Sequence, residues 1–290
     1  MYSSDMFDVN YLKVHGDGSP DNHTAKMLLP YKVPSKDAGF TALTPEEMKE
    51  VLLTVTGWGY NVHTHTCGDG AVKWALDAFE EVRKAGHTQV RLNTGHNLLM
   101  DPADFPRFKE LNVGVDSMIP QVPFSVKMPV LTDAQKKRIN PVKSLIDLGV
   151  RVGLSADYPV MDLNPFRNMY IAITRTDPDD PSNVDTFTAK ERVDFETALK
   201  CYTVNSAYMV GKEDIIGSIE VGKNADLIVI DRNLFEIPTE ELLEVNVLAT
   251  MVDGRVVHEE AVDWDLPKSM LELVPPDFCG SSDEQQHGHK

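Results

Sequence analysis

Short apolar segments alternate with amphipathic helical segments over the first two hundred residues, and this order predicts a parallel sheet. The expected strands are Val9–Val14, Asn61–His65, Gln89–Thr94, Val113–Ile119 and Val150–Leu154. The expected helices are 44–56, Asp69–Lys84, Pro102–Leu111, Asp133–Leu148, one within Phe187–Tyr202 and a short one at Asn205–Met209. A closed barrel of this type needs eight strands. Five strands therefore predict an α/β fold that is a partial TIM-type (β/α) barrel.

The pattern changes after about residue 212. Ala225–Ile230 has the composition of a strand, and Val247–Val252 and Arg255–His258 flank Asp253-Gly254, a strong hairpin signal. We expect residues 1–212 to form the barrel portion and residues 213–262 to form part of a small, composite β-sandwich domain. Residues 263–290 are expected to form a C-terminal extension, and its polar tail from Asp277 is expected to be disordered.

Charge and composition exclude several classes of function. The net charge of −17 argues against nucleic acid or an anionic membrane as the main partner, because both require clustered Lys and Arg. No apolar run has the length of a transmembrane helix, and Met1–Asp8 has no signal-peptide pattern. The three cysteines form no CxxC pair, which favours a reducing, cytoplasmic location. Glycine-rich nucleotide-binding motifs and GxSxG are absent.

Three potential metal ligands stand where predicted strands end. His65 closes the second strand, His96 follows the third, and Asp157 follows the fifth. Because the C-terminal ends of barrel strands point at one shared site, we expect these side chains to converge. Two imidazoles and a carboxylate suit one or two divalent ions, with Zn²⁺ the first choice. Each residue taken alone has an alternative interpretation: His96 as an ordinary loop histidine, and Asp157 as the cap of a turn before Pro159.

Four further residues are candidates for the same site. Lys13 lies in the first strand, where a carboxylated lysine would bridge two ions; the alternative is a solvated strand lysine. His63 shares a strand face with His65, so it is either a second site residue or a packed one. Asp69 is a candidate substrate ligand or a helix N-terminal cap. Arg175 would pair with a substrate carboxylate or form a surface salt bridge.

Several of these segments resemble the amidohydrolase superfamily, and most closely its amidohydrolase-3 branch of YtcJ-like proteins and N-substituted formamide deformylases. His65-Thr-Cys-Gly-Asp-Gly-Ala-Val72 is similar to the family's His-Ala-Ile-Gly-Asp-Arg-Ala-Val, and Leu154-Ser-Ala-Asp-Tyr-Pro-Val160 resembles Gly-Ser-Asp-x-Pro-Val. Gly217-Ser-Ile-Glu-Val-Gly-Lys-Asn-Ala-Asp-Leu227 is similar to a C-terminal family segment. Lys13-Val-His-Gly-Asp-Gly18, Thr24-Ala25 and Pro30-Tyr31 resemble the family's Lys-x-x-x-Asp-Gly and Thr-Ala…Pro-Tyr segment. The resemblance spans Lys13 to about Val257.

The resemblance implies roles for these residues. His65, His96 and Asp157 would match the ligands of barrel strands five, six and eight, and Lys13 the lysine of strand four that is often carboxylated. The family implies hydrolysis of carbon–nitrogen bonds other than peptide bonds in a small amide, formamide or cyclic amide. A metal-activated water would attack, and Asp157 would shuttle the proton to the leaving nitrogen.

Departures from the family pattern leave alternatives open. The strand-one HxH pair is expected upstream of Lys13, where only twelve residues stand, and the usual Glu-His of strand six is Gly95-His96 here. A second hypothesis is therefore a truncated, non-catalytic chain that needs a partner or an upstream segment, or that forms a homodimer. A third keeps the barrel and changes the reaction to hydrolysis of esters, lactones or phosphoesters.

Overall fold

A five-stranded parallel sheet forms the centre of the fold in the computed structural model, which describes residues 8–32, 37–184 and 187–260. Its strands are β1 (Tyr11–His15), β2 (Asn61–Thr66), β3 (Leu92–His96), β4 (Val113–Ser117) and β5 (Val152–Leu154), hydrogen-bonded in sequence order. The predicted α/β class and all five strands are confirmed. Within the described residues β1 and β5 are the two edges of the sheet, so closure of a barrel stays a prediction.

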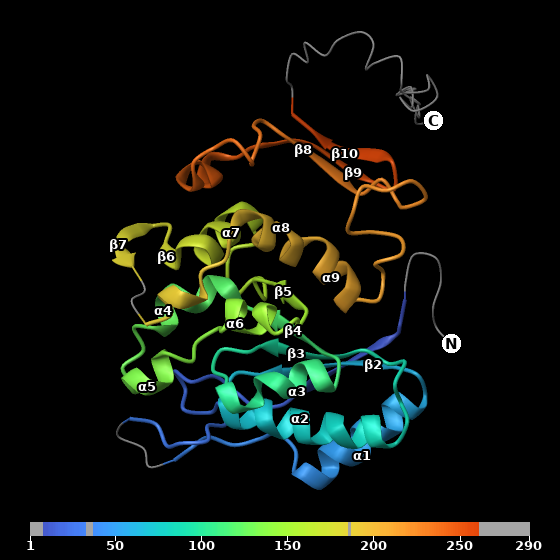
Figure 1. The fold of residues 1–290 in the computed structure, drawn as a ribbon, viewed down its shortest axis with the longest axis vertical. Helices are drawn as coiled ribbons and strands as arrows, with labels where there is room; N and C mark the ends of the chain where they lie inside the picture. Colours follow the sequence, from blue (N-terminus) through green and yellow to red (C-terminus); the bar gives the residue numbers. More distant parts are fainter. Residues whose placement is uncertain (1–7, 33–36, 185–186, 261–290) are drawn as a thin grey trace, which may run out of the picture.

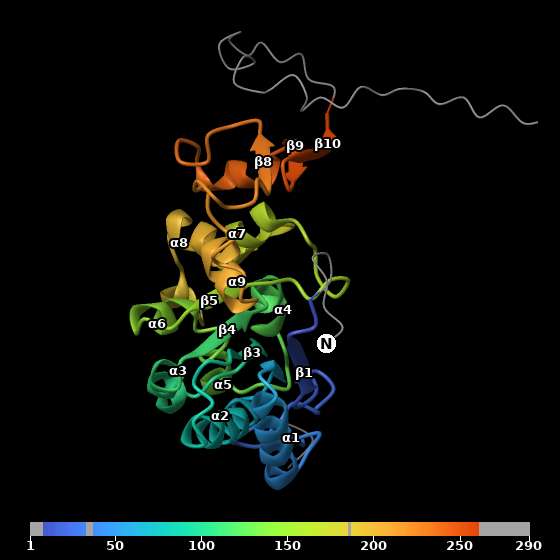
Figure 2. The same cartoon turned by 90° about the vertical axis from the view of Figure 1, so that its right-hand side faces the viewer.

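Helices lie on both sides of this sheet (Figures 1 and 2). The α-helices of the first half of the chain are α1 (Pro45–Gly57), α2 (Asp69–Lys84), α3 (Phe105–Glu110), α4 (Val122–Ser125), α5 (Asp133–Lys136) and α6 (Val142–Asp147). The later ones are α7 (Pro165–Thr174), α8 (Phe195–Tyr202) and α9 (Val204–Met209). Short 3-10 turns occupy Pro102–Asp104, Ile119–Gln121, Ala189–Glu191 and Thr239–Glu244, and a small hairpin pairs β6 (Thr176–Asp177) with β7 (Asp180–Val184).

The two faces of the sheet differ in polarity because side chains alternate along each strand. In β2 the side chains of Val62, Thr64 and Thr66 are fully buried. His63 and His65 lie between them in sequence, point to the opposite face and stay partly exposed. Helices α1, α2 and α3 contact β2, β3 and β4 and cover the buried face. Phe79 of α2 is fully buried there, which stabilises the fold by about 1.5–3 kcal/mol. The polar face is therefore the one that carries potential ligands.

Helix α1 begins with a complete capping box, as the sequence predicts. Glu47 N donates to Thr44 Oγ1 at 3.2 Å, and Thr44 N donates to Glu47 Oε2 at 2.8 Å. Pro45 occupies the first helical position, where its missing N–H costs nothing. This start fixes the helix that leads into β2.

Replacing Thr44 by alanine is expected to lower the free energy of unfolding by about 1 kcal/mol, because the backbone N–H of Glu47 loses its side-chain acceptor. Urea denaturation measures the effect. Thr54→Ala, at an exposed position in the last turn of the same helix, is the matched control and should change stability by less than about 0.5 kcal/mol. Equal losses in both variants would contradict the capping role.

The prediction of one continuous helix at Asp133–Leu148 is wrong. Pro141 interrupts it, and the chain forms α5 and α6 with Asn140 in a left-handed conformation between them (φ 40°). Proline lacks the N–H of the helical ladder and disfavours helical backbone in the residue before it. The predicted Pro102–Leu111 helix also divides, into a 3-10 turn and α3, and helix α7 was not predicted.

The residues after 212 form a separate antiparallel sheet of β8 (Leu227–Ile230), β9 (Val247–Val252) and β10 (Arg255–Glu259), in the order β10-β9-β8. The predicted hairpin is confirmed, since Asp253 (φ 51°) and Gly254 (φ 73°) both have the positive φ that its turn requires. In Figures 1 and 2 this sheet lies beyond the layer of α7, α8 and α9. The sandwich and the domain limits stay predictions.

No described helix combines the length and apolar character needed to cross a membrane. The tail from Asp277, predicted to be disordered, lies outside the described residues.

Candidate metal centre

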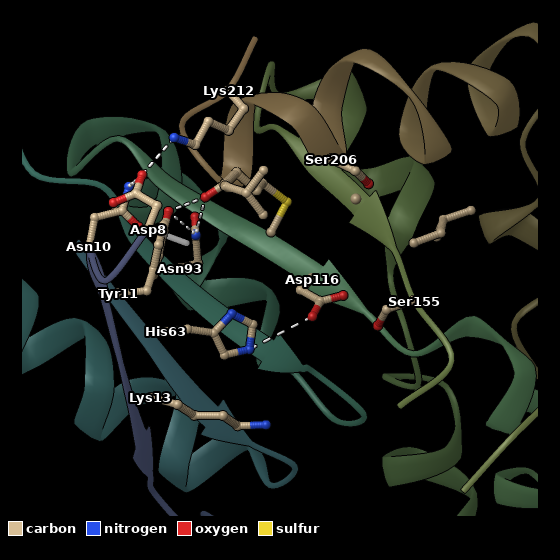
Figure 3. A pocket seen from close by; sticks show the side chains of 14 residues that line it. Asp8, Asn10, Tyr11, Lys13, His63, Asn93, Asp116, Ser155, Ser206 and Lys212 are labelled. Carbon is tan, nitrogen blue, oxygen red and sulfur yellow. Dashed lines mark hydrogen bonds and ion pairs between the residues drawn. The ribbon is translucent and has the colours of Figure 1, made fainter. Parts of the chain in front are cut away.

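The strand register places polar side chains in two adjacent rows on the partly exposed face of the sheet. Lys13 aligns with His63, and His63 aligns with Asn93. In the next row His15 aligns with His65, and Gly95 aligns with Asp116. The rows border a cavity of about 570 Å³ whose lining includes Lys13, His63 and Asp116 (Figure 3).

Helix α9 closes one end of this cavity. The carbonyl oxygen of Met209 accepts hydrogen bonds from the Tyr11 hydroxyl and, at 3.0 Å, from Asn93 Nδ2. Burial raises the pKa of Tyr11 to about 12, so its hydroxyl stays a donor at neutral pH. The potential metal ligands lie toward the other end, where the strands terminate.

His63 and Asp116 point toward one another across the cavity (Figure 3). Nε2 of His63 lies 3.7 Å from Oδ2 of Asp116. Burial lowers the pKa of His63, and the Asp116 carboxylate partly opposes this effect. The ring has room because residue 95 is glycine: a Cβ there would lie 2.1 Å from His63 Nε2. The pair therefore presents an imidazole and a carboxylate to anything bound in the cavity.

The Gly95→Ala variant is expected to displace the His63 ring and to lose about 1–3 kcal/mol of stability through overpacking. Imidazole resonances in NMR spectra and urea denaturation measure the two effects. The control is Gly57→Ala, where the new Cβ would lie at an ordinary 3.5 Å from His87. Unchanged His63 resonances in Gly95→Ala would contradict this close packing.

His65 lies between two other imidazoles. Its ring stacks on His15 with centroids 4.0 Å apart and an interplanar angle of 18°, and its centroid is 4.1 Å from that of His96. Burial lowers the pKa of His65 to about 4, with a further contribution from His15. His65 is therefore neutral at physiological pH, the state in which imidazole binds metals.

His96 and Asp157 meet at the ends of β3 and β5. Nδ1 of His96 lies 3.8 Å from Oδ2 of Asp157 and 3.4 Å from Sδ of Met118. Burial lowers the pKa of His96 to about 3, so this ring is also neutral. Both His96 (φ 68°) and Asp157 (φ 50°) have left-handed backbone, which is costly for residues with side chains and is frequent at functional sites. The structure thus places the His96 ring beside both His65 and Asp157.

Asp17 and Cys67 lie close to the His65 ring. Asp17 is buried, and its carboxylate accepts hydrogen bonds from the backbone N–H groups of Lys26, Cys67 and Gly68 at 2.8–2.9 Å. Its Oδ1 lies 3.8 Å from His65 Nε2. Burial raises the pKa of Asp17 to about 7.

The predicted substrate ligands Asp69 and Arg175 do not line the cavity. Asp69 Oδ1 accepts from Leu28 N at 2.8 Å, and Oδ2 pairs with Arg138 at 3.1 Å. Gly68, not Asp69, is the N-cap of α2, so the cap alternative is wrong. Arg175 is fully buried, so the surface salt bridge is wrong too; its Nη2 donates to the carbonyl oxygens of Asn140 (3.0 Å) and Glu191 (2.9 Å). Their roles as substrate ligands stay predictions that this geometry does not support.

Sequence reasoning did not assign Asp116, Asn93 or Tyr11 to the site. Each stands at an alternate position of its strand, on the face shared with His63. The period-two pattern of β4, in which Val113 and Val115 are buried, was the signal that could have found Asp116.

The donor set fits a divalent metal ion. Nε2 of His96 is buried and has no hydrogen-bond partner among the described residues. A buried polar atom without a partner costs about 1–3 kcal/mol unless a ligand satisfies it. Two neutral imidazoles beside a carboxylate are a usual zinc donor set. Lys13 is exposed and lines the adjoining cavity. Its positive charge contributes to the lowered pKa values of His63, His65 and His96.

Comparison with known proteins places the chain in a family. A family model described as the amidohydrolase family matches residues 2–258. N-substituted formamide deformylase of Arthrobacter pascens is 31% identical over 76% of this chain and 41% of its own length. YtcJ of Bacillus subtilis is 24% identical over 86% of this chain and 47% of its own length.

A solved structure, an uncharacterized metal-dependent hydrolase from Pyrococcus horikoshii, superposes with a TM-score of 0.70 at 25% identity. The match covers 79% of this chain and 45% of that one. The chain thus spans less than half the length of these relatives. By the match over nearly its whole described length, the chain belongs to the amidohydrolase family.

Proposed function

We propose that this chain carries the later part of a metal-dependent active site that hydrolyses carbon–nitrogen bonds, other than peptide bonds, in small amides, formamides or cyclic amides. The observation that supports it most is the position of the His96 ring, which lies beside both His65 and Asp157. The names of two relatives, a formamide deformylase and a deaminase, point to the same bond type.

His65, His96 and Asp157 would hold the ion, with Lys13, as a carbamate formed with carbon dioxide, a fourth ligand. A divalent ion in such a site supplies a Lewis acid that polarises a carbonyl group and lowers the pKa of water. Zinc is the ion that imidazole and carboxylate donors favour. Both imidazoles are neutral at physiological pH, so neither has to lose a proton before binding.

Asp157 is the residue placed to move protons. Its side chain is 42% exposed, so it reaches both water and the buried His96. As a carboxylate it would take the proton of the attacking water and deliver it to the leaving nitrogen, which turns a poor amide leaving group into an amine. The exposed position allows the carboxyl group to return to its ionised state through solvent.

His63 and Asp116 would orient the substrate in the adjoining cavity. An amide group offers one acceptor and one or two donors, and an imidazole with a carboxylate 3.7 Å away offers the complementary groups. The closed end formed by Tyr11, Asn93 and Met209 limits the size of the group that enters. These features support a small substrate.

The test is turnover by the purified, zinc-loaded chain on a panel of N-substituted formamides, cyclic amides, esters, lactones and phosphoesters. We expect hydrolysis of at least one carbon–nitrogen substrate, its loss after chelation, and its return when zinc is restored. Turnover confined to esters, lactones or phosphoesters would overturn the bond type. A metal-loaded, folded chain inert on the whole panel would overturn the proposal for this chain alone.

A further inference from the structure

Three different donor atoms, from Asp17, His65 and Cys67, lie close together, and none of these residues lines the cavity. Nε2 of His65 lies 3.5 Å from Sγ of Cys67 and 3.8 Å from Oδ1 of Asp17. All three ligand atoms lie within 4.8 Å of one another. No role proposed above uses Cys67, and Asp17 and Cys67 are both buried.

These separations are close to those of a tetrahedral site. Zinc binds nitrogen and oxygen at about 2.0–2.1 Å and sulfur at about 2.3 Å, so tetrahedral angles place neighbouring ligand atoms roughly 3.3–3.6 Å apart. The His65–Cys67 separation falls in this range, and the His65–Asp17 separation exceeds it by only a few tenths of an ångström. Small side-chain rotations would bring the three atoms onto one ion.

The backbone holds these side chains in place. Cys67 N donates to Asp17 Oδ1 at 2.8 Å, and Cys67 O accepts from Leu99 N at 2.8 Å. The next residue is Gly68, where a Cβ would lie only 1.9 Å from the carbonyl oxygen of Lys26. The loop is therefore tightly packed against Lys26. A site whose ligands are fixed before binding loses little conformational entropy when the ion arrives.

The buried carboxylate of Asp17 also gains from a cation. Three backbone N–H groups satisfy part of its hydrogen-bonding capacity, and Oδ1 accepts only one of them. Its sole ion-pair contact with a described residue is the one to His65. Burying a carboxylate without a full counter-charge is costly, and a divalent ion would remove that cost.

We propose that Asp17, His65 and Cys67 form an accessory site for a soft divalent cation, Zn²⁺ or Cd²⁺, distinct from the centre formed with His96 and Asp157. The thiolate provides the preference for soft ions. On binding, a sulfur–metal bond forms, and the Cys67 thiol releases its proton to solvent. The charges of one carboxylate, one thiolate and one divalent ion then cancel.

The accessory site and the proposed hydrolytic centre both use His65, so the two sites are linked. This consequence rests on the proposed function. A neutral imidazole has one nitrogen with a free lone pair, and the other carries a proton. An ion on Nε2 of His65 therefore places the proton on Nδ1 and removes this histidine from the hydrolytic centre. The accessory site would act as an inhibitory site at excess zinc, because the two ions compete for one ligand.

The test reads the sulfur–metal bond directly and needs no turnover, so its failure is separate from failure of the proposed function. The Cys201→Ala/Cys279→Ser variant leaves Cys67 as the single thiol of the three. Loaded with Co²⁺, it is expected to show a thiolate-to-cobalt charge-transfer band in the near ultraviolet. A further Cys67→Ser substitution should abolish that band.

X-ray absorption on the zinc-loaded single-thiol protein provides a second measurement that does not depend on folding of the Cys67→Ser variant. A sulfur shell at about 2.3 Å is expected beside the nitrogen and oxygen shell at about 2.0–2.1 Å. The proposal is overturned if the sulfur shell and the band are both absent from the single-thiol protein. It is equally overturned if the band persists after Cys67→Ser in a variant whose circular dichroism shows a native fold.

Discussion

The Asp157→Asn variant is expected to hydrolyse its amide substrate about 100- to 10,000-fold more slowly than the unmodified chain, the usual loss when a general acid–base group is removed. Asparagine preserves the size of the side chain and is unable to accept and return a proton. Because the Asp157 side chain is 42% exposed, the substitution should leave the fold and its stability nearly unchanged. The measurement is kcat on the best carbon–nitrogen substrate of the panel, at matched metal content.

The control is Asp214→Asn, which removes an exposed carboxylate that does not line the cavity. This control variant should retain the full rate. The slower hydrolysis by Asp157→Asn would then result from the place of Asp157 in the site and not from the change in net charge. If Asp157→Asn retained the rate of the unmodified chain, Asp157 would not be the proton carrier, and another carboxylate, with Asp116 the nearest candidate on the cavity wall, would have to be tested.

The second large effect is expected in stability. Arg175→Met should lower the free energy of unfolding by about 3 kcal/mol or more, because the buried carbonyl oxygens of Asn140 and Glu191 both lose a charged donor. The methionine side chain is similar in length to that of arginine but donates no hydrogen bond. The expected loss of stability therefore reflects hydrogen bonding more than side-chain volume. Chemical denaturation measures the change.

Arg255→Met, on the exposed strand β10, is the matched control and should stay within about 0.5 kcal/mol of the unmodified chain. A substrate role for Arg175 predicts a different result. In that case stability would be unchanged and KM would rise, whereas a structural role lowers stability and leaves KM unchanged in the fraction that stays folded.

The parts of the fold that were predicted correctly depend on local signals. The start of α1 follows from Thr44, Pro45 and Glu47, which lie next to one another in sequence and form the cap among themselves. The β9–β10 turn follows from Asp253-Gly254 for the same reason. The division of the 133–148 segment also has a local cause, because Pro141 interrupts the helical hydrogen-bond ladder.

The proximity of His96 to His65 and to Asp157 was predictable because strand order alone brings strand ends together. That argument finds His65, His96 and Asp157, and it needs no side-chain detail. It does not find Asp116, because the pairing with His63 depends on register between β2, β3 and β4 and on the absence of a side chain at Gly95. The burial of Arg175 was not predictable either, since its acceptors lie 35 and 16 residues away in the sequence.

The most direct test of the central claim, that strand-end residues form a metal centre, is the zinc content of purified protein by mass spectrometry. The Cys67→Ser background removes the thiol of the accessory site, and His96→Asn is then introduced into it. We predict about one tightly bound equivalent in Cys67→Ser and about a tenth of that or less after His96→Asn. Equal zinc content in the two folded proteins, or none in either, would contradict the account.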